Sequence, residues 1–190
     1  MRQHTPPTQD QTDKQPLVIP LRTALLDPGG HALPLKGAGC DGHQTECMLT
    51  LSESEQSFTF EGLSQRPVPS LLRNFSAPVI LDREVPDATL RFLVASDSDA
   101  FNRWDSAQTL IRRRVIATMA DQAAGAEAGL PAEDVDAFRQ VLTSDAMDEA
   151  MIAEILTLPG AKEIGEDLET IDPDALVRAR DTVVEQLASA

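Results

Sequence analysis

The sequence contains no tyrosine, one tryptophan, two cysteines and three histidines among its 190 residues. Two cysteines are too few for the disulfide framework of a small secreted protein. The histidines, His4, His31 and His43, fall in expected loops and cannot be assembled into a catalytic triad or a metal-binding group without strain. No apolar run approaches the roughly 20 residues that a membrane-spanning helix needs, and residues 1–16 lack the apolar core of a signal peptide. We therefore expect a soluble cytoplasmic protein.

Basic residues are scarce as well. The chain has 16 Lys and Arg against 31 Asp and Glu, which gives a formal net charge of −15 and a pI near 4.4. Nucleic-acid binding needs a lysine and arginine surface that replaces counterions, and an anionic membrane surface would repel this chain. We therefore predict neither a nucleic-acid partner nor a membrane partner. The hydrophobic content of 42% is that of a globular protein.

The composition changes near Pro86. Residues 1–85 carry a net charge of −3, nine of the thirteen prolines and four alanines, whereas residues 86–190 carry −12, four prolines and twenty alanines. Proline interrupts regular structure, while alanine is the best helix former. We therefore expect two domains of different class, 1–85 and 86–190.

The first part has the pattern of short strands. "LVIPLRTALLD", residues 17–27, is apolar with partial alternation, and "DPGG" at 27–30 is a strong turn signal. Cys47 takes part in the alternation of a later strand, where a buried thiol would behave as a small hydrophobe. Several short strands joined by proline and glycine turns predict a β-sandwich. The predicted strands are 17–27, 31–35, 46–53, 56–63 and 77–84.

The second part has helical spacing. Asp87 and Asp99 each stand where a carboxylate can cap a helix, and "DPDALVRARDTVVEQLA", 172–188, opens with an aspartate followed by proline. Short helices with short connections are typical of stacked αα-hairpins. The expected fold class is α+β in two domains, a sandwich followed by an all-α superhelical segment. The predicted helices are 87–97, 99–122, 131–143, 144–158, 160–170 and 172–188.

One stretch has the side chains of a metal site. "GCDGHQTEC", residues 39–47, places Cys40, His43, Glu46 and Cys47 within eight positions, and zinc prefers these ligand types. The spacing does not match the usual C-x₂-C or H-x₃-H pairs, and the following strand pattern contradicts an H-E-x-x-H helix. We interpret the cluster as structural, without excluding a small metalloenzyme that uses Cys40 and His43.

Other candidate groups favour structural roles too. "RRR" at 112–114 is interpreted as the solvated and partner-facing side of a long helix rather than a nucleic-acid patch, and Phe101 and Trp104 as core anchors. The glutamates at 163, 166 and 169 are typical of a solvated helix face. No glycine-rich phosphate loop and no G-x-S-x-G sequence is present. The residues by themselves indicate a two-domain scaffold without visible chemistry.

Two sequence motifs give more specific information than composition and periodicity do. "RPVPSLLRNFSAPVIL", 66–81, and "FLVASDSDAFNRWDSAQTL", 92–110, resemble the bacterial aminopeptidase N (alanyl aminopeptidase) family of zinc metallopeptidases. The residues 5–21, 153–160 and 171–173 support the resemblance, which covers essentially the whole chain in order. The most specific residues are Pro67, Pro69, Ser70, Leu71, Leu72, Arg73, Phe75, Ser76, Ala77, Pro78 and Val79, then Asp99, Phe101, Arg103, Trp104 and Asp105.

The resemblance implies a fragment of a four-domain parent. The fragment would be the immunoglobulin-like third domain and the start of the C-terminal helical domain. The family's H-E-x-x-H motif, its G-x-M-E-N stretch and its tyrosine match nothing in this chain. The resemblance therefore assigns no catalytic, metal or cofactor residue here, and the zinc would lie in the parent's catalytic domain. The residues expected to carry the structural signature are Pro69, Leu71, Leu72, Arg73, Phe75, Pro78, Phe101, Arg103 and Trp104.

Structural roles are expected for several of these residues. Pro69 and Pro78 would rigidify the chain, and Leu71, Leu72 and Phe75 would supply buried apolar surface. Two interpretations of Arg73 stay open: its planar fork fixes a neighbouring carbonyl or carboxylate, or it is an ordinary exposed arginine.

The resemblance also suggests partners. The fragment would bridge the catalytic domain and the helical domain, which limits peptide access in the full enzyme. The alternative is a free-standing protein-binding module. In the last helix, Leu176, Val183 and Leu187 fall near one stripe with Val184 beside it, and part of this stripe is expected to face water and support weak self-association.

Overall fold

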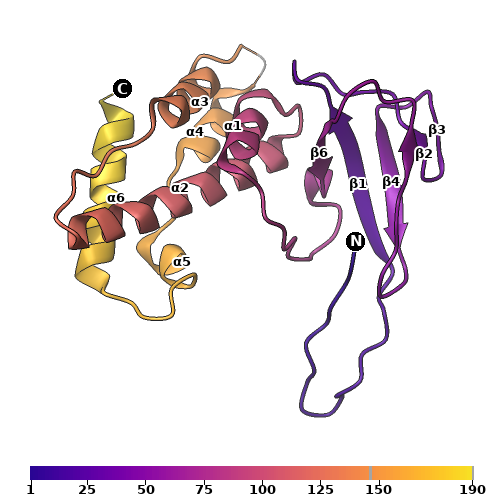
Figure 1. The fold of residues 1–190 in the computed structure, drawn as a ribbon, viewed down its shortest axis with the longest axis horizontal. Helices are drawn as coiled ribbons and strands as arrows, with labels where there is room; N and C mark the ends of the chain where they lie inside the picture. Colours follow the sequence, from indigo (N-terminus) through magenta and orange to yellow (C-terminus); the bar gives the residue numbers. More distant parts are fainter. Residues whose placement is uncertain (146, 190) are drawn as a thin grey trace. The chain divides into compact units, whose positions relative to one another are not determined.

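The computed structural model describes residues 1–145 and 147–189, and the chain forms two compact units (Figure 1). The first unit consists of Met1–Arg83 together with Asp97–Asn102. The second consists of Glu84–Ser96 and Arg103–Ala190. The two units differ in class, as the change of composition near Pro86 predicts, and each has its own apolar core.

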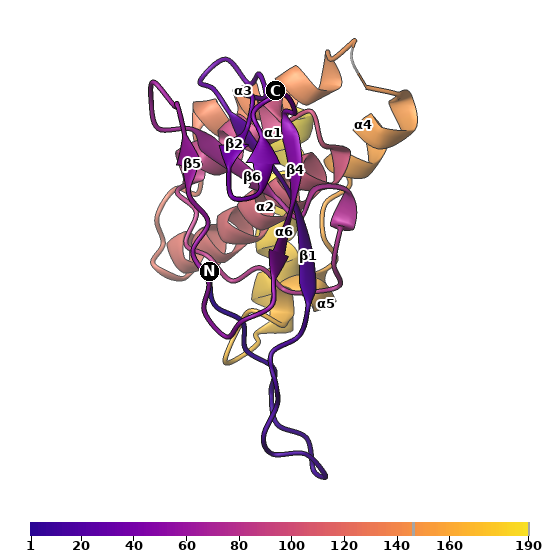
Figure 2. The same cartoon turned by 90° about the vertical axis from the view of Figure 1, so that its right-hand side faces the viewer.

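The main sheet of the first unit has three antiparallel strands in the order β4-β1-β6. β1 is the central strand, and Figure 2 shows it beside β4. Its first four residues alternate between buried and exposed, and residues 23–26 are all buried. Leu21 faces Leu49 across the β1–β4 pair, and both are buried. The strands are β1 (Ile19–Leu26), β4 (Glu46–Leu51) and β6 (Val68–Leu71).

A second, smaller sheet has the order β3-β2-β5. Its strands are two residues each, β2 (Lys36–Gly37), β3 (Cys40–Asp41) and β5 (Phe60–Glu61). Gly37 has a φ of 100°, and a Cβ at this position would collide with the carbonyl oxygen of Thr59. Glycine is therefore the residue that allows β5 to approach β2 so closely. The buried core of this unit contains Ile19, Leu21, Leu49, Leu51, Leu72 and Ala77, with Ala38, Cys40, Cys47, Phe58, Phe60 and Val79 packed against it.

Two of the predicted strands are wrong. Residues 31–35 contribute only an isolated bridge from Ala32 to Leu26 after the predicted turn at 27–30. Residues 77–84 contain no strand, and Ile80 is 97% exposed although β-branched residues favour strands.

A strand that the sequence did not suggest lies at 68–71 instead. Pro69 disfavours a strand at this position, because proline cannot donate a ladder hydrogen bond. β6 is an edge strand, where proline is tolerated.

The helices follow the predicted pattern closely. The capping of α2 and α6 is confirmed, since Asp99 accepts a hydrogen bond from the Asn102 amide and Asp172 accepts one from the Ala175 amide. Two predicted helices are shorter than expected, at 149–156 and 161–165. The helices are α1 (Asp87–Ser96), α2 (Ala100–Ala123), α3 (Ala132–Leu142), α4 (Glu149–Leu156), α5 (Ala161–Gly165) and α6 (Pro173–Ala188).

The core of the helical unit is built by the predicted apolar stripes. Ile111 and Val115 of α2, Val141 of α3 and Ile155 of α4 are at most 1% exposed. Trp104 is half-buried and packs against this core, as an anchor would. Within residues 1–145 and 147–189, none of the helices has both the length and the apolar character to cross a membrane.

Candidate functional site

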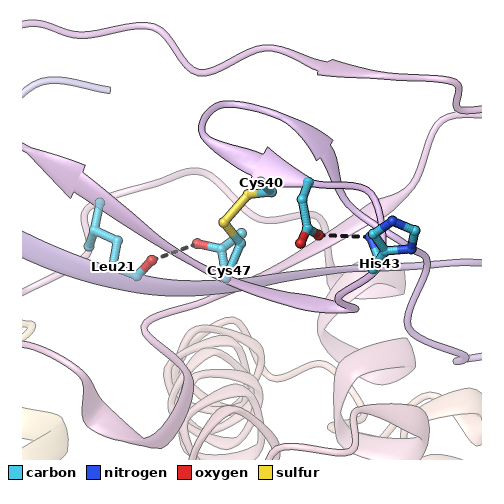
Figure 3. The surroundings of a disulfide bond; sticks show 6 residues. Leu21, Cys40, His43 and Cys47 are labelled. Atoms are coloured by element: carbon cyan, nitrogen blue, oxygen red, sulfur yellow. Dashed lines mark hydrogen bonds between the residues drawn. A yellow bond between two sulfur atoms is a disulfide. The ribbon is translucent and has the colours of Figure 1, made fainter.

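The two cysteines lie on different sheets. Cys40 is on β3 of the small sheet and Cys47 is on β4 of the main sheet, and the two form a disulfide bond with their Cα atoms 6.1 Å apart (Figure 3). Both residues are half-buried against the core of the first unit. The interpretation of Cys47 as a buried free thiol is therefore wrong. The signal that could have suggested the pairing is that a seven-residue separation lets a hairpin turn bring two cysteines together.

The remaining members of the cluster point to other partners. The amide of His43 donates to the Asp41 carboxylate at 2.9 Å, and the imidazole is exposed. The Glu46 carboxylate accepts from Arg73. Among residues 1–145 and 147–189, no three His, Cys, Asp or Glu side chains are placed to hold a metal ion together. Since the two sulfur atoms are bonded to each other, the donors present here do not fit a zinc site.

Arg73 lies at the centre of a buried polar cluster in the first unit. Its side chain is 4% exposed, and all three guanidinium nitrogens donate hydrogen bonds. Nε donates to Glu46, Nη1 to Ser70 and Asp97, and Nη2 to Ser98, each at 2.8 Å. Of the two interpretations left open by the sequence, the structure shows the one in which the planar fork fixes carboxylates.

The chain around Arg73 adopts an unfavourable backbone conformation. Leu72, Asn74 and Phe75 have φ values of 56°, 53° and 48°. Each such residue outside glycine costs about 1–2 kcal/mol. Hydrogen bonds hold the turn in place: the Asn74 amide donates to Asp99 at 2.8 Å, and the Ser76 hydroxyl accepts from the Arg22 amide.

This turn gives the signature residues different environments. Leu72 is 4% exposed and Leu71 is half-buried, as predicted for apolar anchors. Phe75 is 53% exposed, so its expected burial is wrong, because the left-handed turn directs it outward. Its ring packs on that of Phe101, with centroids 5.2 Å apart. Pro78 is exposed, in the segment without a strand.

Two residues of the signature, Arg103 and Trp104, belong to the helical unit. Arg103 is 8% exposed, and it donates through Nε to the Val94 carbonyl at 2.9 Å and through Nη2 to the Ala95 carbonyl. These carbonyls lie in the last turn of α1, where they lack helical partners, and a basic side chain satisfies them. Arg103 and Trp104 thus tie α2 to α1 and to the helical core.

A second charged cluster joins α1, α2 and α3. Asp134 is 1% exposed and accepts hydrogen bonds from Arg91 and Arg114, and Arg114 also donates to Asp87. Asp87 accepts from Arg113 as well. The expected cap role of Asp87 is therefore wrong. Arg114, whose side chain is 16% exposed, does not lie on a solvated face, whereas Arg113 keeps 39% of its side chain exposed.

The same cluster shifts two pKa values. Desolvation raises the pKa of Asp87, but hydrogen bonds from Arg113 and Arg114 outweigh it and hold that pKa below its ordinary value. Burial lowers the pKa of Arg114, and its bonds to Asp134 and Asp87 reverse the direction and raise it.

An open apolar groove lies between α3, α4 and α6. Its volume is about 340 Å³, and Leu142 at its edge is 63% exposed. Of the apolar stripe expected on the last helix, Leu176 and Val183 are buried, at 2% and 0% exposed, whereas Val184 and Leu187 are half-buried and line the groove. The groove is lined by Val135, Phe138, Arg139, Leu142, Leu156, Leu158, Val184, Leu187 and Ala188.

Two family models together match almost the entire chain. Residues 1–84 match DUF3458, a domain of unknown function with an Ig-like fold, and residues 87–190 match DUF3458_C, a domain of unknown function with ARM repeats. This chain belongs to the DUF3458_C family, whose model covers more than half of it. The expected fold class, an immunoglobulin-like domain followed by a superhelical segment, is thereby confirmed.

Two curated relatives that match this chain are both named Aminopeptidase N. The chain is 40% identical to Aminopeptidase N of Escherichia coli (strain K12) over 98% of its own length, and 36% identical to Aminopeptidase N of Haemophilus influenzae over 99%. The resemblance to bacterial aminopeptidase N is therefore confirmed. Each match covers only 21% of the relative, so the chain spans about a fifth of the length of these proteins.

A solved structure agrees with this assignment. The crystal structure of Legionella pneumophila aminopeptidase A in complex with aspartic acid matches 90% of this chain with a TM-score of 0.70 and 30% identity. The match covers 19% of that protein. The region shared by these aminopeptidases is thus a fold of two successive domains that together make up a minor part of each protein.

Proposed function

We propose that the chain is a non-catalytic part of a zinc-dependent aminopeptidase. The proposal rests on one observation: nearly all of this chain aligns with proteins named Aminopeptidase N, yet it spans only 21% of them. Zinc in the catalytic domain of such a parent would supply the Lewis acid. The donors of this chain do not fit a zinc site, which supports a role outside catalysis. Peptides would be substrates of the full-length enzyme only.

In such a parent the chain would bridge the catalytic domain and the helical domain, and the helical domain would limit the access of peptides. A bridging domain has to be rigid, and Arg73 supports this by donating buried charge-assisted hydrogen bonds to Asp97 and Ser98 within the first unit. The remaining domains of the parent would be the principal partners.

The test uses a full-length parent and residues 1–190 in parallel. With an alanyl chromogenic substrate, the parent should show turnover that a chelator abolishes, and the isolated chain should show none. Removing the helical portion from the parent should raise cleavage of long peptides relative to the small substrate. An unchanged ratio of the two rates would reject the role in limiting access.

A free-standing protein-binding module is the alternative, and the open groove between α3, α4 and α6 is the observation that favours it. The natural reading frame decides between the two. A frame that continues into a catalytic domain supports the aminopeptidase, and a frame that encodes this chain alone supports the module.

The cytoplasmic location is also a proposal. In that compartment the glutathione and thioredoxin systems favour thiols over disulfides. Alkylation of free thiols in intact cells, before lysis, would then find Cys40 and Cys47 reduced in a cytoplasmic protein and oxidised in an exported one.

A further inference from the structure

The small sheet of the first unit has few hydrogen bonds of its own. β2 pairs with β3 through Lys36–Asp41 and Gly37–Cys40, and with β5 at the same two residues, Lys36 and Gly37. A two-stranded hairpin is marginally stable by itself in water. Strands of two residues each therefore depend on their attachment to the rest of the unit.

That attachment has an apolar part and a covalent part. Half-buried Phe58, Phe60 and Ala38 pack against the core under the main sheet. The covalent part is the disulfide, which fastens β3 directly to β4 at Cys47, the residue opposite Thr23 of β1 (Figure 3). It is the only covalent link between the two sheets apart from the chain itself, since the sequence has no other cysteine.

The main sheet does not share this dependence. β1 pairs with β4 over six residue pairs and with β6 over four. Its buried leucines at 21, 49 and 51 and the hydrogen bonds of Arg73 involve neither sulfur atom. Opening the disulfide therefore removes a restraint from the small sheet and leaves the main sheet with its own stabilising contacts.

The two cysteines lie outside the fully buried core. Cys40 and Cys47 are both half-buried rather than buried, and Asp41, His43, Gln44 and Thr45 between them are exposed. A thiolate can approach a disulfide only where the sulfur is accessible.

We propose that the Cys40–Cys47 disulfide is a reversible redox-sensitive cross-link that controls the order of the small sheet. A dithiol reductant attacks one sulfur atom as a thiolate, forms a mixed disulfide and releases the other cysteine as a thiolate. The second thiol of the reductant then closes its own disulfide and releases the first cysteine. Two electrons and two protons thereby reach Cys40 and Cys47, and the reductant leaves oxidised. Reduction loosens β2, β3 and β5, and oxidation fixes them again.

Hydrogen exchange of the 190-residue chain with and without dithiothreitol tests this proposal. Reduction should accelerate exchange at 35–42 and 58–62 by about tenfold or more, which reports local opening. Exchange at 19–26, 46–51 and 103–123 should stay within about twofold. The variant Cys40→Ser/Cys47→Ser should exchange like the reduced chain in either buffer, and it controls for effects of the reductant elsewhere.

Titration in glutathione buffers tests reversibility, with the two thiols counted by alkylation and mass. The cross-link should open and close between reducing and oxidising mixtures, and protection at 35–42 should follow it. Equal protection in both forms would show a purely structural disulfide. Loss of protection in β1 as well would show that the disulfide supports the whole unit, and a disulfide that never re-forms would exclude a reversible device. Each of these results overturns the proposal.

Discussion

Arg73 and Asp97 form a salt bridge in which neither side chain reaches solvent: the side chains are 4% and 0% exposed, and Nη1 lies 2.8 Å from Oδ1. The other oxygen of Asp97, Oδ2, has no hydrogen-bond partner within residues 1–145 and 147–189. Arg73 is therefore the group that compensates this buried carboxylate. Replacing buried ion pairs by apolar groups is often tolerated, but removing one partner leaves an uncompensated charge.

The first prediction follows from this pair. Arg73→Met should lower the free energy of unfolding by about 3–5 kcal/mol, because it leaves Asp97 buried without its partner. Arg73→Lys should restore only part of the loss, because an ammonium group cannot reach four acceptors with the geometry of the fork. Urea denaturation measures both values.

A matched control exists on Glu46, the other carboxylate that Arg73 contacts. Arg22 approaches Glu46 at 4.0 Å, with both side chains more than 40% exposed. Arg22→Met should change the free energy of unfolding by less than about 1 kcal/mol. Equal effects at positions 22 and 73 would contradict the assignment of Arg73 as the central residue of the cluster.

The second prediction concerns pH. The folded-state pKa of Asp87 lies below its ordinary value, so its contribution to stability is complete above about pH 4 and is lost as the pH falls through the folded-state pKa. Asp87→Asn should therefore lower the free energy of unfolding by about 1 kcal/mol at pH 7, a modest value because the side chain is 33% exposed. The difference from the natural chain should shrink below about pH 4. Thermal unfolding at pH 7 and pH 3 measures it, and Asp136→Asn in an exposed pair serves as control. A constant difference would show that charge is not the cause.

The third prediction concerns metal. Residues 1–190 should bind no stoichiometric zinc in the disulfide form, because the sulfur atoms are bonded to each other and the Glu46 carboxylate accepts a hydrogen bond from Arg73. Elemental analysis of protein purified without a histidine tag measures this, before and after reduction. One bound zinc per chain, absent from the variant Cys40→Ser/His43→Ala, would contradict the prediction.

The fourth prediction concerns self-association, which stays a prediction. Leu142 is exposed at the edge of the groove between α3, α4 and α6, and a second copy could cover this apolar surface. The net charge of −15 opposes contact, so raising the salt concentration should favour it. Light scattering should show a larger mass at high salt, reduced by Leu142→Ser. Val177→Ser, at an exposed position that does not line the groove, should leave it unchanged. A monomer at every salt concentration would count against association.

The helices could be predicted from sequence because their signals are local. Asp172 followed by Pro173 fixes the start of α6, and the spacing of Ile111 and Val115 fixes the inner face of α2. The strands were harder to predict, because each strand pairs with residues that are distant in the sequence. The residues around Ile80 had the composition of a strand but no partner, while Pro69 concealed an edge strand that β1 pairs with.

The polar clusters were the least predictable part. The partners of Arg73 come from positions 46, 70, 97 and 98, which no single period connects. The disulfide likewise depends on the fold that brings β3 over β4. Composition shows which residues could interact, but the topology decides which of them do.

The salt bridge from Arg73 to Asp97 crosses the border between the two family models, which lies at residues 84–87. A gene break at that border would leave Arg73 with only Glu46 and Ser70 as partners, and the strained turn would lose its hydrogen bond to Asp99. Residues 97–102 would then be encoded with the helical half, although they belong to the first compact unit. The two halves are therefore poor candidates for independent exchange between genes. We expect related genes to encode both halves together, in this order.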